Sequence, residues 1–169
     1  MRKRAELVEA TRQRIVDATV HLHTTVGPAQ ATVSAIAEPA GVTRLTVYRH
    51  FPEQEALFAA CAQQWDSQHP APDAAVWRAI PDLEARARHA LRELYGWHQE
   101  HGETLLPIYR DFDAMPATAR EAARDEVAQF ADALVAGTGV RGHARRRLRG
   151  TAGAVRTRDG EDGARLRGL

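Results

Sequence analysis

Residues 32–51 read TVSAIAEPAGVTRLTVYRHF, and this stretch decides the fold. It predicts a short helix from Val33, a tight turn at Gly41 and a second helix after Thr43. Thr32 and Thr43 stand where helix N-caps are expected, because a threonine hydroxyl accepts from the free N–H groups of a first turn. The stretch therefore predicts two helices joined by a glycine turn.

The second helix has two chemically different faces. Val42 before the cap and Val47 inside the helix have the spacing of a hydrophobic staple, and Val47 and Phe51 share one face. The other face is polar and basic, and it carries Arg44, Thr46, Tyr48 and His50. Such side chains can enter a major groove and hydrogen-bond bases and phosphates. The sequence therefore indicates a DNA-reading helix.

Composition sets the broad class of the protein. The chain has 169 residues, of which 44% are hydrophobic and 27% charged, as in soluble globular proteins. The single cysteine, Cys61, excludes an internal disulfide framework and fits a reducing cytoplasm. No apolar run approaches the roughly 20 residues of a membrane span. We expect a cytoplasmic protein with no membrane partner.

The net charge of +1 hides a segregation along the chain. Residues 1–51 hold seven basic and four acidic residues, whereas residues 52–140 hold seven basic and fifteen acidic ones. Residues 141–169 hold nine basic and three acidic residues. A basic N-terminal segment on an acidic body is the pattern of a protein that binds nucleic acid with one face.

Helical periodicity recurs along most of the remaining chain. It predicts a first helix over residues 11–26, stopped by Gly27 and Pro28. Further helical stretches are expected at 82–100, at 104–113 with an interruption at Pro107, and at 117–136. Pro39 would lie past the first turn of the helix from Val33, where a proline costs about 3 kcal/mol. Because this helix is expected to end near Ala40, the alternative is that Pro39 only shortens its last turn.

The pattern IAxxAGVxxxTVYRHF, preceded by an amphipathic helix and followed by PEQEALF, resembles the DNA-binding domain of a TetR-family transcriptional regulator over about residues 10–65. The resemblance implies an all-α protein whose N-terminal domain is a three-helix helix-turn-helix unit. It assigns residues 1–66 to that domain and 82–136 to a partial helical ligand-binding and dimerisation domain. The prolines of residues 67–81 predict a linker, and the composition of residues 137–169 predicts a tail. His23 stands where relatives carry an aromatic residue, which implies a buried position.

Roles at the DNA follow from the same resemblance. Arg44 and Leu45 match positions that contact base edges, and Thr46 matches a base or phosphate contact. Tyr48 and His50 match phosphate contacts. The alternative for Tyr48 is a structural role, as an aromatic residue at the edge of the core. The candidate DNA-binding residues are Thr32, Thr43, Arg44, Leu45, Thr46, Tyr48 and His50.

The region after the linker resembles the first part of a regulator's ligand-binding domain. Its aromatic residues are candidates to line a pocket for a small apolar ligand, and the alternative is that they form a helical core. The candidate pocket residues are Trp77, Tyr95, His98, Tyr109, Phe112 and Phe130. No cofactor, catalytic residue or metal ligand is predicted, because phosphate loops, nucleophile elbows and paired-cysteine sites are missing from the sequence. We expect a protein that is not an enzyme.

Residues 137–169 depart from the family pattern. They hold eight of the twelve glycines and no aromatic residue, and they lack the two apolar helices that usually build the dimer interface of relatives. We expect this Arg/Gly-rich tail to be disordered. Two functions therefore compete. One is a homodimeric, ligand-responsive repressor, and the other is a truncated relative that does not dimerise and binds specific DNA weakly.

Overall fold

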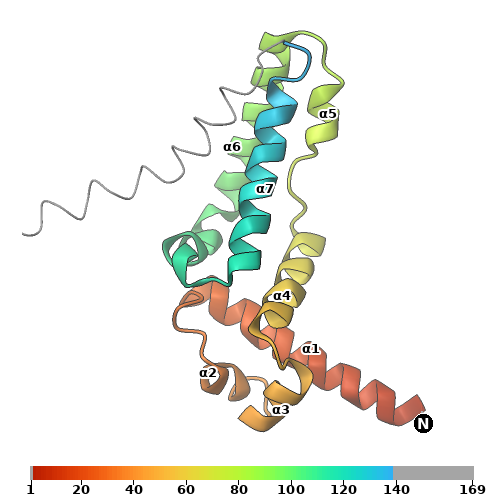
Figure 1. Cartoon of the computed structure of the whole chain (residues 1–169), viewed down its shortest axis with the longest axis vertical. Helices are drawn as coiled ribbons and strands as arrows, with labels where there is room; N and C mark the ends of the chain where they lie inside the picture. The colour runs from red at the N-terminus through yellow and green to blue at the C-terminus, as the bar shows by residue number, and fades with distance from the viewer. Residues whose placement is uncertain (1, 139–169) are drawn as a thin grey trace, which may run out of the picture. The chain divides into compact units, whose positions relative to one another are not determined.

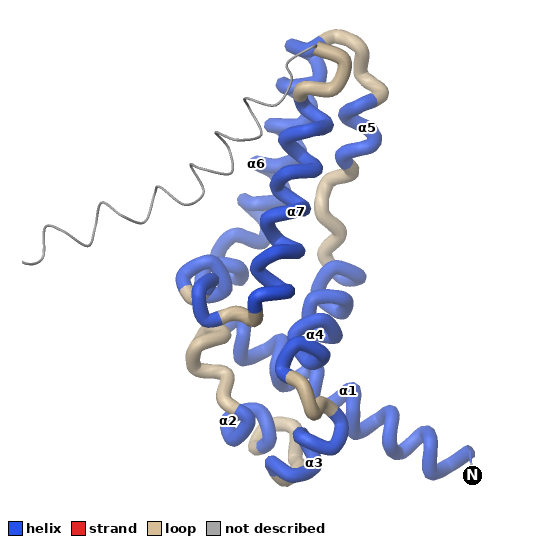
Figure 2. The backbone as a smooth tube through the Cα atoms, viewed as in Figure 1, coloured by secondary structure: helices blue, strands red, loops and turns tan. Residues whose placement is uncertain are grey.

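The computed structural model describes residues 2–138, which fold into helices joined by turns and loops (Figure 1). Within this range no strand occurs, and Figure 2 shows helix and loop only. The all-α prediction is confirmed. The expected tail lies outside the described residues from position 139 onward. The helices are α1 (Arg2–Thr25), α2 (Val33–Ala37), α3 (Arg44–His50), α4 (Gln54–Gln68), α5 (Ala74–Arg78), α6 (Leu83–Arg110), the 3-10 turn η1 (Phe112–Ala114) and α7 (Ala117–Leu134).

The chain forms two compact units. The first consists of the residues up to Pro72 together with Glu93–Ala122, and the second of Asp73–Arg92 with the described residues from Ala123. The long helix α6 and helix α7 each contribute a segment to both units. Each unit therefore consists of two separate segments of the chain.

The first unit is built on a core shared by α1, α2, α3 and α4. Ile15 of α1, Ile36 of α2 and Val47 of α3 expose 0%, 2% and 1% of their surface. Leu57 and Cys61 of α4 complete the same cluster. Burying an aliphatic side chain of this size contributes about 1.5–3 kcal/mol, so these contacts hold the short helices α2 and α3 in place. Neither α2 nor α3 is long enough to be stable alone.

The first helix is longer than the sequence indicated. It begins at Arg2 and not near Thr11, so the basic start of the chain is helical. The physical reason is local composition, since residues 5–10 read AELVEA and are mostly strong helix formers without glycine or proline. At the other end, Gly27 follows the helix with φ +95° and donates to the carbonyl of Leu22 at 3.0 Å. The predicted stop at Gly27 is confirmed.

Pro39 does not interrupt a helix. Helix α2 ends at Ala37, and the turn after it is closed by two backbone bonds, from Val42 to Ala37 and from Gly41 to Glu38, each 3.0 Å long. Gly41 has φ +64°, so the pattern is a Schellman cap with glycine in the left-handed position. Pro39 is exposed on this turn. Pro39 therefore lies after α2 and not inside it, which agrees with the expected early end of this helix and not with a proline in its middle.

Two further boundaries differ from those expected. Helix α6 continues through Pro107, because the proline removes a single N–H while the next bond, from Asp111 to the Pro107 carbonyl at 3.1 Å, is still made. The segment expected as a linker contains α5. Its first turn is capped by Asp73, whose carboxylate accepts from the Ala75 amide at 2.8 Å.

The second unit is centred on Trp77 of α5. Trp77 is completely buried, and its ring centroid lies 5.1 Å from that of Phe130 in α7. Arg86 of α6 is also buried, with 4% of its surface exposed. Its guanidinium donates to backbone carbonyls at the ends of the neighbouring elements, among them Ile80 at 2.7 Å and Leu134 at 3.1 Å. The guanidinium of Arg86 thus supplies hydrogen-bond donors to carbonyl groups at the C-terminal ends of α5 and α7.

Candidate nucleic-acid interface

The two predicted N-caps form as the sequence indicated. The Thr32 hydroxyl accepts from the Ala35 amide at 3.2 Å, and the Thr43 hydroxyl accepts from the Thr46 amide at 3.2 Å. The Thr43 and Thr46 hydroxyls also lie 3.0 Å apart in a hydrogen bond. These contacts satisfy free N–H groups at the first turns of α2 and α3. They fix where each helix begins, and so which residues of α3 face outward.

The inner face of α3 is anchored in the first unit. Val47 exposes 1% and Phe51 4% of its surface, and Val42 packs against the same cluster, as the staple spacing predicted. The guanidinium carbon of Arg12 in α1 lies 4.5 Å from the centre of the Phe51 ring. Such cation–π contacts contribute about 0.5–1 kcal/mol at exposed sites. Helix α3 is therefore held on α1 at its C-terminal end.

The outer face of α3 is open to solvent. Leu45 exposes 69% and Tyr48 53% of its surface, and Arg44 and Arg49 are exposed as well. Thr46 and His50 are partly covered at the flanks. Tyr48 is thus a surface residue rather than a core aromatic. Leu45 is one of several large apolar side chains that the structure leaves exposed, so its position is notable only because it lies on the same face of α3 as Arg44 and Tyr48.

Arg44 is held loosely rather than committed to a partner inside the protein. Its Nη1 atom donates to the Ser34 hydroxyl of α2 at 3.4 Å, the outer limit of a hydrogen bond. Because this contact is long and neutral, the guanidinium keeps most of its donor capacity for an external acceptor. The Arg44 side chain therefore bridges the two helices of the motif while remaining available at the surface.

His23 is buried between α1 and α4. It exposes 6% of its surface, and its ring lies 4.6 Å from the ring of Phe58 in α4. Burial lowers the pKa of His23 from 6.5 to about 4, since a charged imidazole would lose its hydration there. The position implied by the family pattern is confirmed. Burial likewise raises the pKa of the Cys61 thiol to about 12, so Cys61 is an inert core residue.

The candidate ligand-pocket residues fall into separate groups. Trp77 and Phe130 are in contact in the second unit. In the first unit, His98 lies 6.5 Å from Tyr109 between ring centroids, and its Nδ1 atom is 2.8 Å from the Leu94 carbonyl. Tyr95 exposes 70% of its surface, so it is on the outside of α6 and not among core aromatics. Phe112 lies in η1, partly covered.

Two further features are absent from residues 2–138. This part of the chain holds no group of three His, Cys, Asp or Glu side chains placed to bind a metal ion. In the same range, no helix is both long and apolar enough to cross a bilayer.

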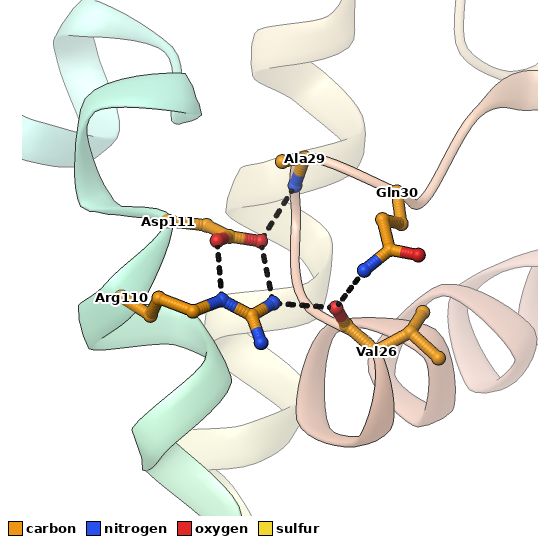
Figure 3. Close-up of polar contacts among 5 residues, drawn as sticks. All are labelled: Val26, Ala29, Gln30, Arg110 and Asp111. Carbon is orange, nitrogen blue, oxygen red and sulfur yellow. Dashed lines mark hydrogen bonds and ion pairs between the residues drawn. The ribbon is translucent and has the colours of Figure 1, made fainter. Parts of the chain in front are cut away.

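Sequence reasoning missed one set of contacts in the first unit. Arg110 and Asp111, at the end of α6, hydrogen-bond the turn after α1 (Figure 3). The sequence signal was limited to the Gly27-Pro28 stop, which indicates a turn but not its partner. Since the partners are more than 80 positions apart along the chain, no local pattern could pair them.

Comparison with known proteins agrees with this geometry. Residues 15–61, which run from α1 into α4, match the family described as bacterial regulatory proteins of the tetR family. Over 70 residues the chain is 46% identical to the HTH-type transcriptional regulator SrpR of Pseudomonas putida, a match that covers 41% of this chain and 32% of SrpR. It is 44% identical over 70 residues to the uncharacterized HTH-type transcriptional regulator TtgW, also from Pseudomonas putida, which covers 41% of this chain and 50% of TtgW.

The match thus spans 32% of one of these relatives and 50% of the other. No solved structure is significantly similar to the chain. The matched residues contain the two capped helices, the glycine turn and the core that carries them. In this helix-turn-helix region, the chain is similar to the TetR family of bacterial regulatory proteins.

Proposed function

We propose that the protein is a cytoplasmic transcriptional repressor that reads operator DNA with the outer face of α3 and releases it when a small apolar ligand binds. The observation that carries the proposal is the two-sided character of α3. Its inner side is buried at Val47 and Phe51, while Leu45 and Tyr48 are exposed beside Arg44. A helix that is fixed on one side and open on the other is suited to insertion into a major groove.

Individual roles follow from side-chain chemistry. Arg44 can donate two hydrogen bonds to the O6 and N7 atoms of a guanine, and exposed Leu45 suits the methyl group of a thymine. Tyr48 and His50 can donate to phosphate oxygens, and we assign further phosphate contacts to Thr32 and Thr43 at the starts of α2 and α3. Base contacts would set the sequence that is read, and phosphate contacts its register.

A homodimer would strengthen such binding. Two copies related by a two-fold axis would place their α3 helices about 34 Å apart, one turn of DNA, on a palindromic site. The composition of residues 137–169 favours the second candidate function, a chain that does not dimerise, because eight glycines and no aromatic residue supply little apolar area for an interface. A monomer would bind specific DNA towards the non-specific range, about 10⁻⁴–10⁻⁶ M.

The test is selection of bound duplexes from a random library, followed by titration of the enriched sequence. We expect Arg44→Ala to lower affinity for that sequence between about fivefold and 150-fold, which corresponds to 1–3 kcal/mol for one bidentate base contact. Arg92→Ala is the control, since Arg92 is an exposed arginine of α6 and its loss removes the same charge. Failure to enrich any sequence, or equal effects of both variants, would contradict the proposal. Light scattering of the same samples separates dimer from monomer.

A further inference from the structure

The turn between α1 and α2 determines how the helix-turn-helix begins. It runs from Val26 to Thr32, the N-cap of α2, and it carries its own backbone bonds, from Gln30 to Gly27 at 3.1 Å and from Thr32 to Gln30 at 2.8 Å. Because α2 is only five residues long, its direction depends on where this turn delivers the chain. Any group that fixes the turn therefore also fixes α2.

Arg110 and Asp111 are such groups (Figure 3). Arg110 Nη2 donates to the Val26 carbonyl at 2.7 Å, and the Asp111 carboxylate accepts from the Ala29 amide at 3.1 Å. The two side chains also pair with each other, with Arg110 Nε 2.8 Å from Asp111 Oδ1 and Arg110 Nη2 3.1 Å from Oδ2. We name these four groups the α1–α6 latch: the two side chains, the Val26 carbonyl and the Ala29 amide.

The latch matches the electrostatics of the turn. The Val26 carbonyl lies just past the end of α1, where free carbonyls carry partial negative charge and favour a cation. The Gln30 side-chain amide donates to the same carbonyl at 3.1 Å. Bonding to Arg110 and to the Ala29 amide holds the pKa of the Asp111 carboxyl below its usual value. The cationic Arg110 thus contacts a carbonyl oxygen, and the anionic Asp111 contacts a backbone N–H group.

Gly27 shows how closely α6 approaches the turn. A Cβ atom added at Gly27 would collide with the Asp111 carboxylate and with Nη2 of Arg110. The backbone of Gly27, at φ +95°, is also one that other residues rarely adopt. The side chain of Asp111 is 10% exposed, so it is enclosed against this turn rather than displayed at the surface.

We propose that Arg110 and Asp111 are positioning residues for DNA reading, which hold the turn before α2 so that α2 and α3 present their outer faces in the binding geometry. The proposal rests on the proposed DNA-binding function and adds residues that do not touch DNA. The latch acts through the turn on α2, and α2 passes the constraint to α3 across the Gly41 turn, whose backbone bonds leave little freedom.

The experiment compares affinity for a selected duplex with affinity for a scrambled duplex of the same length. For Asp111→Ala we expect specific affinity to fall tenfold or more, while affinity for the scrambled duplex changes less than twofold. A variant that is merely less folded would lose both in proportion. Glu84→Ala is the matched control, because Glu84 is an exposed acid on α6, paired with Arg88, and its loss changes the net charge equally. Arg110→Gln provides a second variant if Asp111→Ala folds poorly.

A double-mutant cycle tests the contact itself. Arg110→Gln should reduce specific affinity strongly in the native background and much less in the Asp111→Ala background, because the two side chains bond each other and hold the same turn. Unchanged specific affinity in Asp111→Ala and Arg110→Gln, a parallel loss on both duplexes, or additive effects in the cycle would each overturn the proposal. If the native chain selects no duplex at all, the DNA-binding function itself is refuted.

Discussion

Replacing His23 by phenylalanine should remove a specific acid sensitivity of folding. His23 is buried against Phe58, and its pKa in the folded chain is about 4, compared with 6.5 for an unperturbed histidine. Between these two values the unfolded chain binds a proton at this position and the folded chain does not. The contribution of neutral His23 to the free energy of unfolding is therefore complete above pH 6.5, and it is lost as the pH falls from 6.5 towards 4.

The magnitude follows from the two pKa values. Each unit of difference corresponds to about 1.4 kcal/mol, so lowering the pH from 7.5 to 5.0 should cost the native chain about 2 kcal/mol through His23 alone. The variant His23→Phe should not show this loss of about 2 kcal/mol, because phenylalanine does not bind a proton. The phenyl ring keeps the aromatic contact with Phe58 and needs no hydration, so we expect no loss of stability at the higher pH.

Urea unfolding at the two pH values, followed by circular dichroism, measures the difference directly. His21→Gln is the control, since His21 is an exposed histidine of the same helix and should leave the acid sensitivity intact. If His23→Phe loses as much stability between the two pH values as the native chain does, then His23 is protonated in the folded state. The account of its burial would then be wrong.

Three further substitutions or probes test other parts of the fold. Thr43→Ala should lower the free energy of unfolding by about 1 kcal/mol through loss of the α3 cap, measured by urea titration. Arg86→Met should cost about 3 kcal/mol, because it leaves buried carbonyls at the ends of α5 and α7 without donors; a thermal melt that is unchanged would refute its role. Cys61 should resist a thiol reagent in the native chain and react rapidly in urea, because burial raises its pKa to about 12.

The helix-turn-helix could be predicted because its signals are local. The caps at Thr32 and Thr43, the left-handed glycine at Gly41 and the staple of Val42 with Val47 each involve residues within a few positions of one another. Such short-range rules can be applied to neighbouring residues without knowledge of any tertiary contact. They located helix α3 and separated its buried side from its exposed side.

The remaining features depend on contacts that the sequence does not display. Pro107 indicated a broken helix, but the rest of α6 outweighs one lost hydrogen bond. Tyr95 was expected among packed aromatics, yet its side of α6 is exposed. The pairing of Asp111 with the Ala29 amide joins positions 82 apart, so only the folded chain reveals it.

The guanidinium of Arg86 has a consequence for how this protein can change over time. Its described partners are main-chain oxygens of Ile80, Pro81, Leu134 and Ala136. Every amino acid brings such an oxygen, so substitutions at those four places leave the acceptors intact. No other side chain can supply five N–H donors in a planar fork. Substitutions should therefore be tolerated at the four positions that supply carbonyl oxygens, but not at Arg86.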